Sequence, residues 1–92
     1  RLRLIASPDG EDGSLTMKQD ARLFSARIDA GKDVRFTADP KRKYWLQVAR
    51  GGLDFQGQAF DSGDGIAIAE EGGTLALTAR SDAEILLFDL PQ

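Results

Sequence analysis

Apolar and polar residues alternate along most of the chain, and this alternation is the feature that most restricts its fold. It is clearest in Gly31–Gly51, where apolar residues occupy every second place on both sides of Pro40. Alternate side chains of a strand point to opposite faces, whereas a helix needs a period of about 3.6, which no window of the chain shows. The stretch therefore predicts two strands, Asp33–Ala38 and Tyr44–Arg50, joined by a charged turn at Asp39–Lys43.

The rest of the chain has the same period, and turn residues recur about every eight to twelve residues. We expect further strands at Arg1–Ala6, Ala21–Asp29, Leu53–Gln56, Ala59–Phe60, Ile66–Ala69, Thr74–Thr78 and Ala83–Leu90. About nine short strands with glycine-rich turns predict an all-β sandwich or barrel of antiparallel strands. The continuous apolar run Ile85–Phe88 is typical of a strand that is covered on both faces.

The pair Gly51-Gly52 is typical of a tight hairpin turn. It predicts that Tyr44–Arg50 pairs with Leu53–Gln56. On that interpretation, one face of both strands is buried, with side chains from Leu46, Val48, Leu53 and Phe55.

The composition excludes several classes of function. The 92 residues suffice for one small domain, and they contain neither histidine nor cysteine, so imidazole and thiolate chemistry are absent. Basic residues are interleaved with acids, which argues against nucleic-acid binding, and no apolar run is long enough for a membrane span. The lack of cysteine fits a reducing compartment, so we expect a cytoplasmic location. The first residue is Arg1, so we also expect a domain fragment of a longer protein.

The spacing within Gly31–Gly51 resembles the first signature of the cupin superfamily, which runs Gly, five residues, His-x-His, four residues, Glu, six residues, Gly. Both glycines match. The metal-ligand positions between them hold Thr37, Asp39 and Tyr44 in place of the two His and the Glu. The resemblance implies a cupin jelly roll whose first three ligands are missing.

The second cupin signature runs Gly, five residues, Pro-x-Gly, two residues, His, three residues, Asn, and it is matched only at its start. Gly63 supplies the first glycine, whereas Ala69 and Glu71 replace the Pro and the second Gly. Thr74 takes the place of the last metal-ligating His, and Thr78 that of the Asn.

A more specific resemblance covers most of the chain. The segments LIASPDGEDGSLTMKQDARLFSARIDAG, WLQVARG and AEILLFDLP resemble the C-terminal cupin of bacterial pirin-like proteins, a group also labelled quercetin 2,3-dioxygenase-like. Relatives often have His where this chain has Lys18. The resemblance implies that residues 1–92 form a single cupin-like domain, the C-terminal half of a longer protein. Its N-terminal cupin would carry a metal ion on three His and one Glu.

The resemblance implies a supporting role for this domain rather than catalysis. We expect no catalytic residue, cofactor or metal here, and degenerate ligand positions at Thr37, Asp39, Tyr44 and Thr74. The expected partner is the N-terminal cupin of the same protein, and a homodimer is a second candidate.

Two alternatives stay open at this point. A dioxygenase with an atypical site would need Asp39, Tyr44 and a further acid, Asp61 or Asp64, although oxygen-only sites suit Mg²⁺, Ca²⁺ or Mn²⁺ better than iron. A stand-alone small-molecule-binding cupin would use hydroxyl groups inside the barrel. The candidate hydroxyls are those of Thr37, Tyr44, Thr74 and Thr78.

Three other features have simpler interpretations. The acidic loop Ser7–Ser14 lacks the alternating acids of a calcium-binding loop, so we expect a plain turn-rich loop. The basic run Lys41–Lys43 is expected to be a solvated tip. Trp45 falls on the face of its strand opposite Leu46, and a large aromatic there needs cover. We therefore expect Trp45 to lie in an interface.

Overall fold

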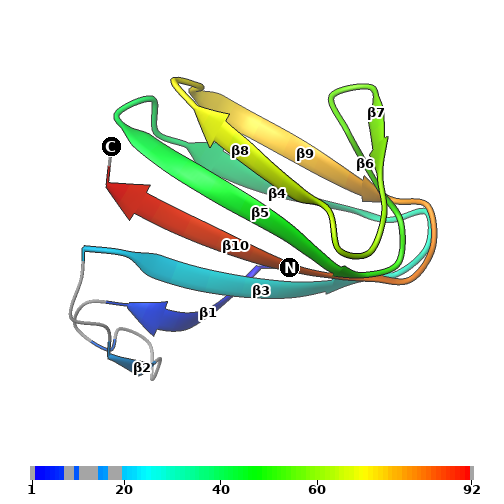
Figure 1. Cartoon of the computed structure of the whole chain (residues 1–92), viewed down its shortest axis with the longest axis horizontal. Coiled ribbons are helices and arrows are strands. Elements are labelled where there is room, and N and C mark those ends of the chain that lie inside the picture. Colours follow the sequence, from blue (N-terminus) through cyan, green and yellow to red (C-terminus); the bar gives the residue numbers. More distant parts are fainter. Residues whose placement is uncertain (1, 8–9, 11–14, 17–19, 92) are drawn as a thin grey trace.

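The chain forms a sandwich of two β-sheets in a computed structural model that describes residues 2–7, 10, 15–16 and 20–91 (Figure 1). The strands are β1 Arg3–Ser7, β2 Leu15–Thr16, β3 Arg22–Ile28, β4 Asp33–Ala38, β5 Arg42–Arg50, β6 Leu53–Phe55, β7 Gln58–Phe60, β8 Gly65–Ala69, β9 Gly73–Ala79 and β10 Ala83–Pro91. The described residues include no helix, and so none that could cross a membrane.

One sheet has six strands in the order β2-β1-β3-β10-β5-β8, and the other has four in the order β4-β9-β6-β7. All pairings are antiparallel except the short contact between β1 and β2. The predicted all-β jelly roll is confirmed. The predicted strands match closely, although β5 begins at Arg42 rather than Tyr44.

The core lies between the two sheets, where the inward faces of their strands meet. Side chains at alternate positions of β5 and β10 are almost completely buried: Leu46, Val48, Ile85 and Leu87. Opposite them lie inward side chains of the four-stranded sheet: Val34, Phe36, Leu53, Phe55 and Leu77. The predicted burial of Leu46, Val48, Leu53 and Phe55 is therefore confirmed. Truncating a buried leucine of this kind to alanine costs about 2–5 kcal/mol.

The hairpin predicted at Gly51-Gly52 is wrong. β5 pairs with β10 and β8 in one sheet, whereas β6 pairs with β7 and β9 in the other. The two glycines carry the chain from one sheet to the other. A type I′ hairpin needs a positive φ at both central residues, and only Gly51, with φ 77°, has one. A Cβ on Gly51 would overlap the carbonyl oxygen of Asp82, so the glycine is needed for a close approach to the β9–β10 turn.

The last strand also differs from its prediction. β10 is fully buried on one face, through Ile85 and Leu87, but Leu86 and Phe88 on the other face are only half-buried. Both faces are apolar, yet the residues that the structure describes cover only one of them completely. Most of the acidic loop Ser7–Ser14, and also Lys18, lie outside the described residues.

Candidate functional site

Two of the four cupin ligand positions lie on the outer surface of the sandwich. Thr37 of β4 and Thr74 of β9 are directly paired across the four-stranded sheet. Both side chains are exposed, because they alternate with the buried Phe36 and the inward-facing Leu75. Neither threonine is directed toward the space between the sheets. Thr78, a candidate hydroxyl for ligand binding, is exposed on the same outer face.

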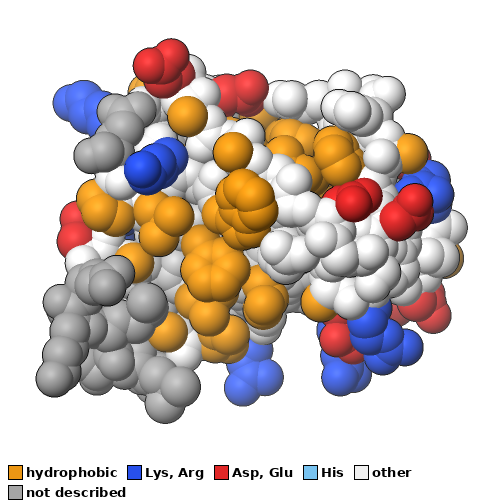
Figure 2. All heavy atoms as spheres, viewed as in Figure 1, with side chains coloured by type: hydrophobic (Ala, Val, Ile, Leu, Met, Phe, Trp, Pro, Cys, Tyr) orange, Lys and Arg blue, Asp and Glu red, His pale blue; other side chains and the backbone are white. Residues whose placement is uncertain are grey.

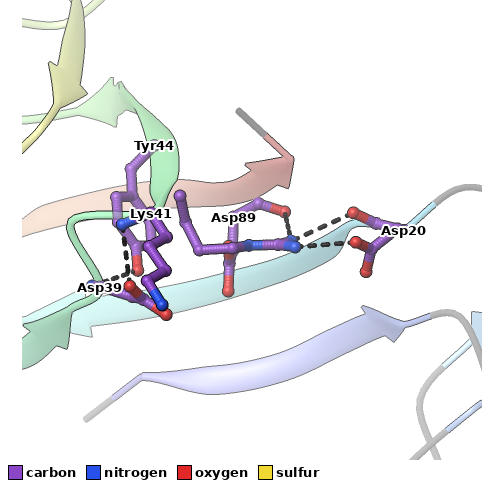
Figure 3. Close-up of polar contacts among 6 residues, drawn as sticks. Asp20, Asp39, Lys41, Tyr44 and Asp89 are labelled. Carbon is purple, nitrogen blue, oxygen red and sulfur yellow. Dashed lines mark hydrogen bonds and ion pairs between the residues drawn. The ribbon is translucent and has the colours of Figure 1, made fainter.

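The other two positions, Asp39 and Tyr44, are brought together, and they hold each other in place (Figure 3). The backbone N–H of Asp39 donates to the Tyr44 hydroxyl at 2.8 Å, and Asp39 Oδ1 accepts from the N–H of Lys41 at 2.8 Å. Tyr44 is only 7% exposed, and its ring packs edge-on against Phe36 with centroids 5.5 Å apart. The phenol therefore fills the core and closes the β4–β5 turn, and the aspartate side chain caps that turn.

A charged cluster beside Tyr44 was not predicted (Figure 3). Arg42 Nε donates to Asp89 Oδ1 at 2.8 Å, and its Nη1 donates to Asp20 Oδ2 at 2.8 Å. The Arg42 and Asp89 side chains are only 19% and 17% exposed. The hydrogen bond with Asp89 raises the pKa of Arg42 above its ordinary value, with a smaller contribution from Asp20.

The prediction that Lys41–Lys43 forms a solvated tip is wrong for Arg42. Lys41 and Lys43 are exposed, but Arg42 lies on the inward-facing side of β5 with Tyr44. It ties the start of β5 to the end of β10 and to the segment before β3. A structural role follows from these contacts, since the guanidinium already has two carboxylate partners.

The acids considered for an atypical metal site are not brought together either. Asp39 lies before the start of β5, whereas Asp64 bonds near the end of that strand, where Val48 N–H donates to its carbonyl at 2.9 Å. Asp64 Oδ2 accepts from the N–H of Asp61 at 2.8 Å, and Asp61 pairs with Arg80 at 3.1 Å. These carboxylates shape the β7–β8 loop.

The residues present do not fit a bound transition metal. Within the described part of the chain, no three His, Cys, Asp or Glu side chains lie close enough to share an ion. The positions of the cupin ligands hold two exposed threonines, a turn-capping aspartate and a buried tyrosine. A neutral hydroxyl or phenol is a poor donor to iron, nickel or copper compared with imidazole.

A surface hollow of about 770 Å³ lies on the outer face of the six-stranded sheet. Its lining comes from β1, β3, β5 and β10: Arg3, Ser25, Ala26, Arg27, Ala49, Glu84, Ile85 and Leu86. Arg27 and Arg50 both reach Glu84, at 3.3 and 3.4 Å. The hollow could not be predicted from any one segment, because it is formed by four strands that are distant in sequence.

Trp45 lies on the same outer face and is 40% exposed. Its Nε1–H donates to Gln47 Oε1 at 3.1 Å, and Gln47 Nε2 donates to the carbonyl of Asp64 at 3.2 Å. The predicted orientation, opposite to Leu46, is confirmed. The expected interface stays a prediction.

Comparison with known proteins agrees with this architecture. The profile of the quercetinase C-terminal cupin domain family matches residues 4–90. A quercetin 2,3-dioxygenase of Escherichia coli K12 is 36% identical over 89 residues, which are 97% of this chain and 38% of that protein. The pirin-like protein YhaK of the same strain is 35% identical over 96 residues, covering 99% of this chain and 40% of that protein.

Solved structures extend the agreement to three dimensions. The Escherichia coli pirin YhhW, in complex with nickel(II), superposes with a TM-score of 0.92 at 35% identity, over 99% of this chain and 39% of that one. A quercetin 2,3-dioxygenase from Acinetobacter baumannii gives a TM-score of 0.80 at 16% identity over 98% of this chain and 32% of that one, which shows the shared fold alone. The chain spans about two fifths of the length of the curated relatives it matches. It belongs to the quercetinase C-terminal cupin domain family, within the pirin-like proteins.

Proposed function

We propose that this chain is the non-catalytic C-terminal cupin of a longer, pirin-like protein, and that it supports an N-terminal cupin that carries the metal ion. The proposal rests on the contacts made by the residues at the four cupin ligand positions. The Tyr44 hydroxyl accepts from the backbone N–H of Asp39, the exposed Asp39 carboxylate caps the β4–β5 turn, and Thr37 and Thr74 face solvent. None of these side chains is left to complete a site between the sheets.

The filled interior supports the same proposal over a small-molecule-binding role. The space between the sheets is occupied by a continuous cluster of buried side chains, which includes Leu46, Val48, Leu77 and Ile85. Small β-barrels and sandwiches are commonly filled by side chains in this way. The hydroxyls of Thr37, Thr74 and Thr78 are on the outside, so they could not line an interior ligand site.

The relatives support a role as part of a larger protein. The chain covers 38% of the Escherichia coli quercetin 2,3-dioxygenase, so most of such a protein lies outside this domain. In our proposal that remaining part holds the catalytic metal. The residues of this domain would then contribute stability and position. The metal, its ligands and the flavonol chemistry would belong to the N-terminal cupin.

The experiment is to substitute Asp39→Asn and Thr74→Ala in the longer protein and to measure quercetin turnover and metal content. Asparagine retains an oxygen that can accept from the Lys41 N–H, so the turn survives the change. We expect both measurements to match the unsubstituted protein. The matched control replaces one metal-ligating His of the N-terminal cupin and should abolish both. Loss of metal and turnover in Asp39→Asn, with the fold intact, would overturn the proposal.

A further inference from the structure

The outer face of the six-stranded sheet carries an apolar row that crosses four strands in register. Leu23 of β3 pairs with Phe88 of β10, Phe88 pairs with Trp45 of β5, and Trp45 pairs with Ala67 of β8. We name these four residues the apolar row. Leu86 and Leu90, on the same face of β10, extend it on either side. Figure 2 shows hydrophobic side chains gathered across the middle of the face that β10 and β5 present.

The outer face of the other sheet has a different character. Its exposed side chains on β4 are those of Asp33, Arg35 and Thr37, and those on β9 are Thr74, Ala76 and Thr78. Asp33 and Arg35 form an ion pair at 3.1 Å. A sheet face that is hydrated in the native protein typically has this polar composition. The contrast indicates that only the six-stranded sheet is adapted to be covered.

Trp45 is held in a fixed position within the apolar row. Gly65 lies beneath it on β8, and a Cβ there would overlap Cζ2 of the indole. Its Nε1–H is bound to Gln47, which is in turn bound to the Asp64 carbonyl. An aromatic side chain that is already ordered loses little conformational entropy when a partner covers it. Aromatic residues of this kind are the common anchors of interfaces.

Charged residues flank the apolar row on the β1–β3 side and around Glu84. The surface hollow beside Leu86 is bordered by Arg3, Arg27 and Glu84, and Arg50 also reaches Glu84. Protein interfaces typically have an apolar centre with a polar, charged rim. The face therefore combines an ordered tryptophan, a continuous apolar row and a charged margin.

We infer that the apolar row is the surface on which the N-terminal cupin of the longer protein packs, an inference that rests on the proposed function. The relatives have room for such a partner, since this chain covers only 38–40% of their length. Domain interfaces within one chain typically bury roughly 600–1,500 Å². Among the residues that the structure describes, Trp45 is the one large hydrophobic side chain classed as exposed.

The test is hydroxyl-radical footprinting of the longer protein, which reports the solvent access of individual side chains. We expect Trp45 and Phe88 to be oxidised several-fold more slowly in the longer protein than in the 92-residue chain, in which Trp45 is 40% exposed, at every protein concentration used. Equal reactivity in the two proteins would overturn the inference. Protection that is lost on dilution, with dimers seen by sedimentation, would also overturn it, because a second copy would then be the occupant.

A matched pair of variants locates the contact. Ala67→Arg places a guanidinium in the apolar row, and Ala76→Arg places the same group on the polar outer face of the other sheet; both alanines are exposed. We expect Ala67→Arg to raise the reactivity of Trp45 several-fold and to increase the radius of gyration in solution scattering. Ala76→Arg should change neither. Equal effects of the two variants would contradict the inference. Continued protection of the buried Leu46 from oxidation shows that each variant keeps its fold.

These results separate the inference from the proposed function. A metal ion bound to this domain would overturn the proposed non-catalytic role and leave the footprint of Trp45 unaltered. An exposed Trp45 in the longer protein would overturn the docking surface, while metal content and turnover would still support the non-catalytic role.

Discussion

At the scale of single residues, Gly65 determines where the Trp45 indole can lie. The ring occupies the space that a side chain at position 65 would fill. The hydrogen bond to Gln47 fixes its direction along the sheet. The exposed aromatic is thus ordered by two neighbours on its own sheet, and its position depends on the absence of a single methyl group.

Gly65→Ala should displace the indole, because the new Cβ and the ring cannot occupy the same space. Trp45 is the single tryptophan of the chain, so its fluorescence reports this change directly. We expect stronger quenching by acrylamide and a shift of the emission to longer wavelength. Ala69→Ser, an exposed change on the same strand, is the control and should leave both unchanged. An unaltered spectrum in Gly65→Ala would show that the ring does not rest on this glycine.

At the scale of elements, Arg42 joins three segments that are far apart in sequence. It connects the start of β5 with the end of β10 through Asp89, and with the segment before β3 through Asp20. Since the pKa of Arg42 is raised in the folded chain, this stabilisation is fully present below the pKa of the unfolded arginine. It fades only as the pH rises through the higher folded value.

A double-mutant cycle with Arg42→Met and Asp89→Asn should give a coupling energy of about 1–3 kcal/mol in urea unfolding, since both groups are largely shielded from water. The matched cycle uses Arg27 and Glu84, whose side chains are 87% and 33% exposed. Exposed pairs typically contribute about 0–1 kcal/mol. Equal coupling in the two cycles would refute the special role of Arg42.

The crossing between the sheets depends on Gly51. In Gly51→Ala the alanine has a positive φ, and its Cβ overlaps the Asp82 carbonyl oxygen. In Gly57→Ala the alanine also has a positive φ, but no atom lies within 4 Å of its Cβ. A left-handed conformation costs about 1–2 kcal/mol for a residue with a Cβ. We expect Gly57→Ala to lower the free energy of unfolding by about that amount and Gly51→Ala by clearly more. Similar losses would mean that the close approach at Gly51 is unimportant.

At the scale of the whole molecule, local alternation predicted the faces of the strands well. The burial of Leu46 and Leu53 follows from a period of two, which is a property of neighbouring residues. Strand pairing is not local, so Gly51-Gly52 was compatible with both a hairpin and a crossing between sheets. For the same reason, the register that aligns Leu23, Phe88 and Trp45 could not be predicted from any one segment.

The candidate site was likewise predicted only in part from the sequence. Signature spacing identified the four ligand positions, but it could not say which way each side chain points. The alternation with Phe36 already placed Thr37 on the opposite face, and this was the signal that it does not line the interior. Arg42 also shares its face with Tyr44, so alternation could have separated it from the exposed Lys41 and Lys43.

We propose that this domain holds no catalytic metal, and elemental analysis of the purified chain tests this most directly. The chain is exposed to excess iron, nickel or copper, desalted, and assayed for bound metal per polypeptide. We predict far less than one ion per chain, because no imidazole or thiolate exists to bind it and Asp39 is the single carboxylate among the four ligand positions. Near-stoichiometric metal that disappears in Asp39→Asn would contradict the account.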